Sequence, residues 1–226
     1  MFTKRGRRVA ALGAAGLGAC AVLAACSPVQ VGAAAVVGNQ RITVSALDTQ
    51  VSNLQAAVKP YGSSLPITTA EEPSEVLAWL IRFAVMDQVA TANNISVTDA
   101  QSQAGLSALA ATAQSNGFSS TAELLVANGV SPQMFPQVGR WAAEETAYEL
   151  KANGGTAPTS TAQQTTVTTA FTKAECTAAK SLNISVSPQF GRVDYTQFTI
   201  VPVANTLSQP EGTPTPASTE GLTPAC

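Results

Sequence analysis

The chain of 226 residues contains no histidine, and few of its residues are charged or aromatic. Without histidine it lacks the commonest general base, the commonest ligand for transition metals and the usual pH switch. No spacing typical of a phosphate-binding loop, a nucleophile elbow, a zinc protease or a CxxC pair occurs. We therefore expect no catalytic residues, no metal site and no cofactor, and an enzyme is the least favoured class of function.

Two pairs of adjacent acids, Glu71-Glu72 and Glu144-Glu145, are the only groups that suggest paired catalytic carboxylates. Neighbouring residues on a helix point in different directions, whereas a general acid and base must converge on one substrate. The pairs are therefore predicted to be solvated surface charges.

Charged residues make up only 12% of the chain, and the basic ones are unevenly distributed. Four of the twelve lie between Lys4 and Arg8, so eight bases face fourteen acids in the rest of the chain. Nucleic-acid binding needs a clustered basic surface that neutralises phosphates, and none follows residue 25. Neither nucleic acid nor a small-molecule substrate is an expected partner.

Residues 1–25 have the three parts of a secretory signal: a basic start, a short apolar run and small residues before a cut. Leu23-Ala24-Ala25-Cys26 resembles the lipobox of bacterial lipoproteins, in which the cysteine is acylated. The resemblance implies that a lipidated Cys26, carrying palmitate-type chains, anchors the protein on the extracytoplasmic face of the cell membrane. Leu17-Gly18-Ala19-Cys20 is a weaker match, and ordinary cleavage or an uncut anchor remain alternatives.

The stretch 26–33 would form a short tether, of which Ser27 to Gly32 can span roughly 20 Å when fully extended. The following domain should therefore sit close to the lipid headgroups. Two or three acyl chains bind a membrane far more firmly than one.

With Cys20 and Cys26 in the signal, Cys176 and Cys226 are a possible disulfide in an oxidising compartment. Such a bridge would contribute about 4 kcal/mol of stability, and two unpaired thiols are the alternative.

The first half of the mature chain has a hairpin pattern followed by helical periodicity. Gly38-Asn39 joins two short apolar segments and predicts a β-hairpin over 33–43. Apolar residues at helical spacing and capping residues then predict a series of helices. Their expected ranges are 43–58 with Thr43 or Ser45 as cap, 74–93, 98–115 with a Thr98/Gln101 capping box, 120–128 with a Ser120/Glu123 box, and 131–151.

The second half is less regular. Gly, Thr, Ser, Pro and Gln dominate 154–165, which predicts a flexible or solvated linker, and a helix is expected over 166–182. Alternating apolar residues predict strands over 184–191 and 197–201. The tail, 203–226, is rich in Pro, Thr and Ser, has little to bury and is expected to be disordered.

Three segments together resemble the N-terminal chaperone domain of SurA-like periplasmic proteins. They are Ala35-Val36-Val37-Gly38-Asn39 with Ile42-Thr43 and Leu47-Asp48, then Asn94-Ile95-Ser96-Val97-Thr98-Asp99-Ala100, and finally Val186-Ser187-Pro188-Gln189-Phe190-Gly191. In the family's last strand an arginine stands where this chain has Gln189. The resemblance covers roughly 34–202 and implies a mainly α, multi-helix domain with a small β element that joins its N- and C-terminal segments.

The family often carries a parvulin isomerase domain at the position of the 154–165 linker, and a dozen residues cannot form one. The resemblance therefore implies a chaperone module without isomerase activity, a holdase for unfolded or extended segments of exported proteins. Candidate client-binding residues are Met134, Phe135, Val138 and Trp141, with the first two expected to be the most exposed. At helical spacing such residues more often fill the core, which is the favoured alternative. The alternative function is a structural or scaffolding lipoprotein that binds one envelope partner.

Overall fold

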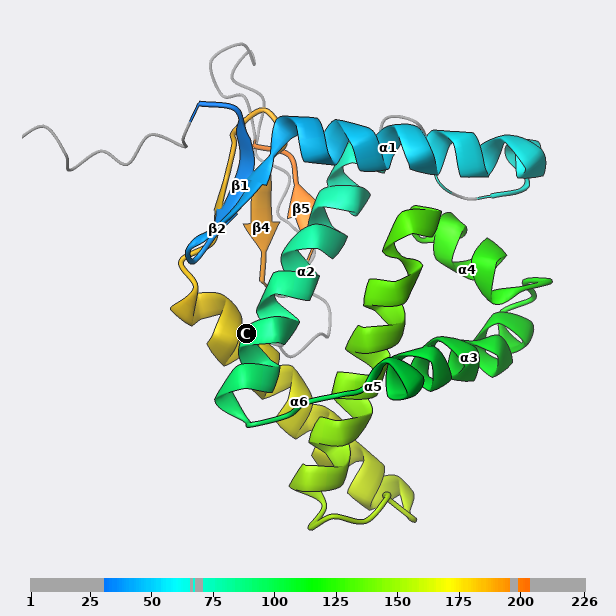
Figure 1. Cartoon of the computed structure of the whole chain (residues 1–226), viewed down its shortest axis with the longest axis vertical. Helices are drawn as coiled ribbons and strands as arrows, with labels where there is room; N and C mark the ends of the chain where they lie inside the picture. The colour runs from blue at the N-terminus through cyan, green and yellow to red at the C-terminus, as the bar shows by residue number, and fades with distance from the viewer. Residues whose placement is uncertain (1–30, 66, 68–70, 196–198, 204–226) are drawn as a thin grey trace, which may run out of the picture.

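The computed structural model describes residues 31–65, 67, 71–195 and 199–203 (Figure 1). The signal segment with Cys20 and Cys26, most of the tether and the tail with Cys226 lie outside these residues. Among the described helices, none is long and apolar enough to cross a bilayer.

The helices are α1 (Val44–Val58), η1 (Lys59–Ser64), α2 (Glu72–Ala92), α3 (Asp99–Ser115), α4 (Thr121–Ala127), η2 (Pro132–Met134), α5 (Phe135–Ala152) and α6 (Thr161–Ser181). The strands are β1 (Ala33–Val37), β2 (Gln40–Thr43), β3 (Ser185–Val186), β4 (Arg192–Asp194) and β5 (Thr199–Val201).

The predicted fold class is confirmed, because most of the chain is helical and a small β element joins its two ends. β1 is the middle strand of a three-stranded sheet with the order β2-β1-β3, and both pairings are antiparallel. Ala35 lies opposite Val186, and the backbone N–H of Ser187 extends the pairing by donating to the carbonyl of Ala34 at 2.8 Å. Segments about 150 residues apart in the sequence therefore share one sheet.

The turn of the predicted hairpin depends on Gly38. Its backbone has φ +57°, a conformation that favours glycine, and its N–H donates to the carbonyl of Leu182 at 2.7 Å. A Cβ at this position would lie 2.8 Å from Cδ2 of Leu182. The hairpin turn thus also fixes the end of α6 beside the sheet.

Short-range capping accounts for most helix starts. Thr43, rather than Ser45, caps α1 by accepting from the N–H of Ala46. The predicted capping box of α3 is present, because the Thr98 hydroxyl accepts from the N–H of Gln101 and the Gln101 side chain accepts from the N–H of Thr98. At α4 half of the predicted box is present, because the Ser120 hydroxyl accepts from the N–H of Glu123, whereas the Glu123 carboxylate accepts from the N–H of Ser119 at 2.7 Å and not from that of Ser120. Local hydrogen bonds that sequence spacing can identify therefore position these helices.

The predicted linker is too long at its C-terminal end, because α6 begins at Thr161 and not near residue 166. The hydroxyl of Ser160 accepts from the N–H of Gln163, and the Gln163 side chain accepts from the N–H of Thr159 at 2.9 Å. Threonine hydroxyls in the first turns donate to the carbonyl four residues earlier, which satisfies these side chains within the helix. Composition alone therefore gave the wrong boundary.

The late strands also differ from the prediction. β3 contains only Ser185 and Val186, and the chain turns at 188–190 instead of continuing as a strand to Gly191. β4 was not predicted. It pairs antiparallel with β5, and Arg192 lies opposite Val201. A Cβ on Gly191 would lie 2.3 Å from the carbonyl oxygen of Val201, so the pairing of these strands requires glycine there. The start of the predicted 197–201 strand lies outside the described residues.

Helix α2 is the central core element that its apolar sequence predicts. Figure 1 shows it running through the middle of the molecule, with the strands on one side and α3, α4 and α5 on the other. It contacts α1, α5 and α6 as well as β1 and β5. Its innermost side chains are no more than 1% exposed: Val76, Leu77, Ile81, Val85, Met86 and Val89.

Helices α3 and α5 approach each other unusually closely, and two glycines permit the contact. A Cβ on Gly105 would lie 2.5 Å from the carbonyl oxygen of Gly139, and one on Gly139 would lie 2.4 Å from the carbonyl oxygen of Ser102. Both contacts are to backbone atoms, which cannot move aside as a flexible side chain could. Any larger residue at these positions must separate the two helices.

Gly139→Ala is expected to destabilise the protein by about 1–3 kcal/mol, because overpacking at the helix crossing exceeds the helix propensity that alanine adds. Urea unfolding followed by circular dichroism measures the change. Ser107→Ala on the exposed side of α3 is the matched control and should stay within about 0.5 kcal/mol of the original chain. An unchanged midpoint for Gly139→Ala would contradict the close approach.

Candidate functional site

The four predicted client-binding residues lie at or near the start of α5, but the structure divides them into two groups. Met134 and Val138 are each only 1% exposed and belong to the hydrophobic core. The prediction that Met134 is among the most exposed of the four is therefore wrong. It fails because the 3-10 turn η2 directs Met134 inward, on the same side of the chain as Val138.

Phe135 and Trp141 are half-buried, and Trp141 belongs to an aromatic cluster with Trp79 and Phe83. The rings of Trp79 and Trp141 meet edge to face with centroids 6.2 Å apart. The indole N–H of Trp79 donates to the carbonyl of Asn128 at 2.7 Å, which ties α2 to the end of α4. This aromatic cluster is partly accessible while its orientation is fixed by packing.

A groove runs between α3 and α5, and we call it the α3–α5 groove. Its volume is about 450 Å³, which is within the range of protein ligand sites, and most of its accessible surface is apolar, although most of its lining residues are polar. α3 places Leu106 in the groove, and the first turn of α5 adds Pro136. The polar lining residues are Asp99, Ser102, Gln103, Gln137 and Arg140.

A smaller pocket of about 60 Å³ adjoins the α3–α5 groove and shares Gln137 and Arg140 with it. Its apolar wall comes from the aromatic cluster residues Phe83 and Trp141 together with Met86. The groove and the pocket therefore lie next to each other, with Gln137 and Arg140 between them. The half-buried rings of Phe83 and Trp141 line the pocket.

Arg140 stands between the groove and the pocket and is held by two acids. Its guanidinium donates to Asp87 at 2.6 Å and to Glu144 at 2.8 Å. The arginine side chain is about half exposed, whereas that of Glu144 is only 4% exposed. The ion pairs therefore link α2 to α5 beside the groove and the pocket.

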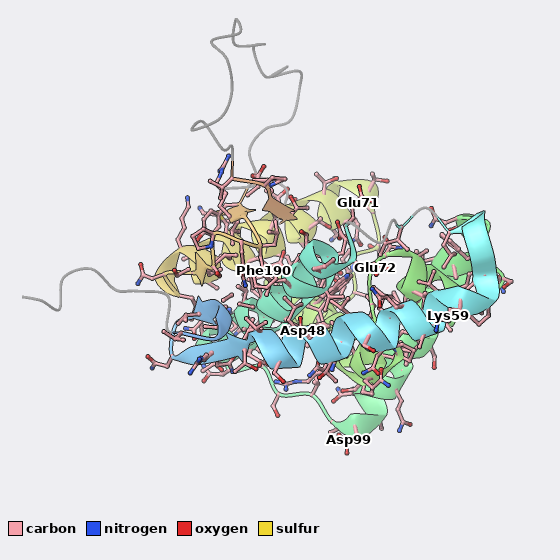
Figure 2. The ribbon with its side chains drawn as sticks, turned by 90° about the horizontal axis from the view of Figure 1, so that it is seen from above. Asp48, Lys59, Glu71, Glu72, Asp99 and Phe190 are labelled. Atoms are coloured by element: carbon pink, nitrogen blue, oxygen red, sulfur yellow. The ribbon has the colours of Figure 1, made fainter. Side chains whose placement is uncertain are left out.

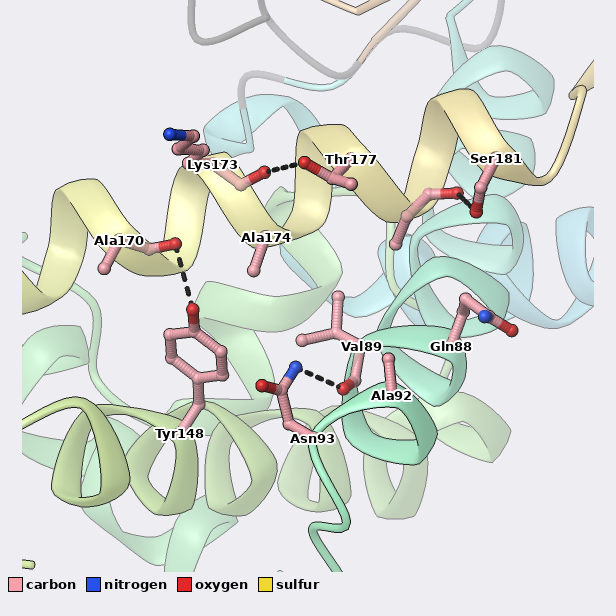
Figure 3. Close-up of a pocket in the computed structure, with 11 residues that line it drawn as sticks. Gln88, Val89, Ala92, Asn93, Tyr148, Ala170, Lys173, Ala174, Thr177 and Ser181 are labelled. Atoms are coloured by element: carbon pink, nitrogen blue, oxygen red, sulfur yellow. Dashed lines mark hydrogen bonds between the residues drawn. The ribbon is translucent and has the colours of Figure 1, made fainter.

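A second hollow, the α2–α6 hollow, lies between the end of α2 and the face of α6, with a volume of about 340 Å³. Figure 3 shows the short side chains of Ala174 and Ala92 facing the space between the two helices. The hydroxyl of Tyr148 donates to the carbonyl of Ala170 at 3.2 Å, which fixes one wall of the hollow. Lys173 is the only charged residue in its lining.

A cluster of charged groups lies where α2, α5 and α6 meet. Arg82 of α2 interacts electrostatically with Glu145 of α5 and Glu175 of α6, and its guanidinium lies 4.8 Å from the ring centre of Trp79. Burial lowers the pKa of Arg82, and the negative charges of Glu175 and Glu145 oppose this shift. Burial raises the pKa of Glu175, and the positive charge of Arg82 opposes that shift. The indole N–H of Trp141 is also buried here, and its geometry does not give it a hydrogen bond. It lies near Glu175, and this proximity lowers the pKa of the Glu175 carboxyl.

Glu145 has the most strongly altered acidity of this cluster. Burial is the largest cause, and together with the negative charges of Glu149 and Glu175 it raises the pKa of Glu145 to about 7, against the opposing charge of Arg82. Glu145 is thus partly protonated near neutral pH. One arginine among several buried carboxylates leaves an excess of negative charge inside the helical junction.

The acid pairs that were predicted to be solvated are partly buried. Glu72 and Glu144 are each 3% exposed. Glu72 accepts from the Gln55 amide at 2.8 Å, while Glu144 is held by Arg140. Burial raises the pKa of Glu144, and Arg140 lowers it by a smaller amount. The position of Glu72 therefore depends on a partner on α1 that the local sequence does not indicate. Glu144 is held by Arg140 of its own helix, which in turn binds Asp87 of α2.

No group of three or more metal-binding side chains gathers anywhere in the described parts of the chain. Cys176 on α6 is disulfide-bonded, and its partner lies outside the described residues. The pairing with Cys226 and the lipidation of Cys26 remain predictions. Large hydrophobic residues that are exposed, as far as the structure describes the chain, are limited to Val31 and Val203.

Sequence reasoning missed the residues that shape the α3–α5 groove. Arg140 and Glu144 stand four residues apart, a spacing that predicts an ion pair on a helix, but nothing local reveals Asp87 as the further partner. Gly105 and Gly139 were also available as a signal, because glycine inside a helix often marks a close helix contact. The groove itself results from that long-range contact.

Comparison with known protein families matches residues 11–140 to the SurA-like N-terminal domain, a chaperone-like, peptide-binding type of domain. The match covers more than half of the chain and includes all elements from β1 to the first turns of α5. α6 and the strands β3, β4 and β5 follow the matched range, although β3 completes the sheet begun by β1. No curated protein and no solved structure matches the chain significantly.

The buried position of Glu145 predicts how stability depends on pH. The folded protein retains the Glu145 proton up to pH about 7, whereas in the unfolded chain the group ionises near 4.5. At a pH between these two pKa values, unfolding releases the Glu145 proton. The free energy of unfolding therefore falls as pH rises from about 4.5 to 7. Glu145→Gln should make that decline shallower and stabilise the protein at pH 8 by about 1–2 kcal/mol, since the carboxylate retains some solvent contact.

Chemical denaturation at pH 5 and at pH 8 tests this expectation. Asp48→Asn, which neutralises an exposed acid on α1, is the matched control and should leave the difference between the two pH values unchanged (Figure 2). Equal pH dependence in Glu145→Gln and the original chain would show that Glu145 ionises alike in the folded and unfolded states.

Proposed function

Because the chain belongs to the SurA-like N-terminal domain family, we propose that it is a chaperone-like protein that binds unfolded or extended segments of exported proteins. Family membership is the observation that carries this proposal. The activity is holding: binding is non-covalent, needs no nucleotide and includes no isomerase step. Its effect is to cover apolar segments of a client until the client folds or passes on.

The α3–α5 groove and the adjoining pocket are the proposed client site. Few large apolar residues are exposed in the described part of the chain, whereas the groove has accessible apolar surface. Leu106 and Pro136 would contact an extended segment in the groove, while Phe83 and Trp141 would contact a side chain in the adjoining pocket. Of the predicted residues, Trp141 lines this pocket, Phe135 is half-buried and directly precedes Pro136, and Met134 and Val138 belong to the core.

The lipobox-like sequence supports a location at the membrane. Acylation of Cys26 would hold the domain on the extracytoplasmic face, where newly exported chains emerge. A short tether favours encounter with those chains over clients far from the membrane. The alternative, a scaffolding lipoprotein that binds one envelope partner, would use the same site for a single defined surface.

A light-scattering assay tests the holding activity. A soluble form that begins at Ser27 should suppress aggregation of an unfolded exported protein at near-stoichiometric ratio. Gln137→Lys should raise the ratio needed for half suppression about fivefold, because client binding would desolvate the new charge. Gln137 lies where groove and pocket meet and is exposed, so the substitution should leave folding intact.

Gln133→Lys is the matched control, because Gln133 is exposed one turn earlier and lines neither the groove nor the pocket. It should behave like the original chain. Equal effects of the two variants would exclude the α3–α5 groove as the client site. No suppression by the original chain, even in large excess, would contradict a general chaperone and favour the single-partner scaffold.

Cys26→Ser should release the protein from the membrane fraction and abolish incorporation of labelled palmitate, because the acylated sulfur would be lost. Cys20→Ser is the control and should remain in the membrane fraction with its label. Loss of the label in Cys20→Ser but not in Cys26→Ser would identify the weaker lipobox-like sequence as the one that is used.

A further inference from the structure

The α3–α5 groove and its adjoining pocket carry an excess of negative charge. Three acids lie on their walls, Asp99, Asp87 and Glu144, against the single base Arg140. The two sites therefore hold a net charge of about −2, and the excess remains negative even with Glu144 protonated. Outside the basic N-terminal segment, acids also exceed bases along the chain.

Arg140 offers little attraction to an incoming acid because both of its partners are already in place. Its guanidinium is bound to Asp87 at 2.6 Å and to Glu144 at 2.8 Å. Asp99, by contrast, is exposed at the start of α3 and lines the groove beside its apolar wall. Figure 2 shows Asp99 at the edge of the molecule, where a bound chain can reach it.

We propose that the α3–α5 groove selects extended polypeptide segments in which a basic residue flanks an apolar one. The apolar side chain lies against Leu106 and Pro136, and the basic side chain lies near Asp99. This inference rests on the proposed holding function and names its preferred client. Apolar contact supplies the affinity, while charge complementarity supplies the selectivity.

The α2–α6 hollow gives an internal comparison. It has a similar apolar lining and no acid, and Figure 3 shows its one charged lining residue, Lys173, with its side chain on the side of α6 away from Tyr148. Without an acid in its lining, this hollow should not favour a peptide with basic flanks. A preference for basic flanks would therefore point to the α3–α5 groove.

Three labelled peptides with the same leucine-containing centre, flanked by Lys, Gln or Glu, provide the test. Fluorescence anisotropy with the soluble form that begins at Ser27 should give the tightest binding for the Lys peptide. The Glu peptide should bind about three- to tenfold more weakly, as expected for one or two exposed charge pairs. High salt should reduce this difference, because exposed charges are screened.

Asp99→Asn should narrow the difference between the Lys and Glu peptides at least about twofold, which corresponds to the loss of one exposed pair. Asp48→Asn removes the same charge from α1, outside both hollows, and should preserve the difference. A preference that Asp99→Asn leaves unchanged would overturn the inference.

The remaining outcomes separate this inference from the proposed function. Equal binding of all three peptides, with binding still weakened by Gln137→Lys, would overturn the charge selectivity and leave the client site in place. Tightest binding of the Glu peptide, lost in Lys173→Gln, would overturn the inference and assign binding to the α2–α6 hollow. No peptide binding together with no suppression of aggregation would refute the holding function itself.

Discussion

The burial of α2 is the constraint on which the rest of the structure depends. This helix contacts three other helices and two strands, so its side chains must satisfy neighbours on nearly every side. Apolar side chains can pack against these neighbours without a loss of hydrogen bonds. Arg82 lies on the same helix, however, and burial of its charge without a partner would cost free energy. Carboxylates from α5 and α6 accompany it, and their number exceeds what one arginine can neutralise. The raised pKa of Glu145 is therefore a consequence of packing, and it makes the junction of the three helices sensitive to pH.

The small residues of α3 and α5 form a second constraint, and the α3–α5 groove depends on it. Gly105 and Gly139 let the two backbones come close, and the residues that line the groove belong to the same two helices. The same contact brings Asp99 of α3 and Arg140 of α5 to one surface, although they are far apart in the sequence. The polarity of the groove is thus set by a helix crossing that glycine permits. Larger residues at the crossing would change both the shape and the charge of the site.

Features that depend on neighbouring residues were predictable from the sequence, and features that depend on distant ones were not. The hairpin at Gly38 and the capped starts of α1, α3 and α4 follow from bonds within a few residues, and the family resemblance was confirmed. The start of α6 carried a local signal in Ser160 and Gln163, but its composition resembles a linker. The burial of Met134, Glu72 and Glu144, by contrast, depends on contacts between distant elements. For the same reason the groove could not be located from α5 alone.

A protein that exposes little apolar surface can still act as a holdase if weak binding is sufficient. A groove of this size contacts only a few client side chains, so each encounter is expected to be weak and short-lived. Attachment to the membrane would compensate, because exported chains emerge close to the anchored domain and meet it at a high effective concentration. Covered aromatics also limit self-association, which a permanently exposed apolar patch would promote on a crowded membrane surface. Modest affinity and the proposed lipid anchor would therefore be complementary properties: the groove would provide a contact that is easily released, and the anchor would make that contact frequent.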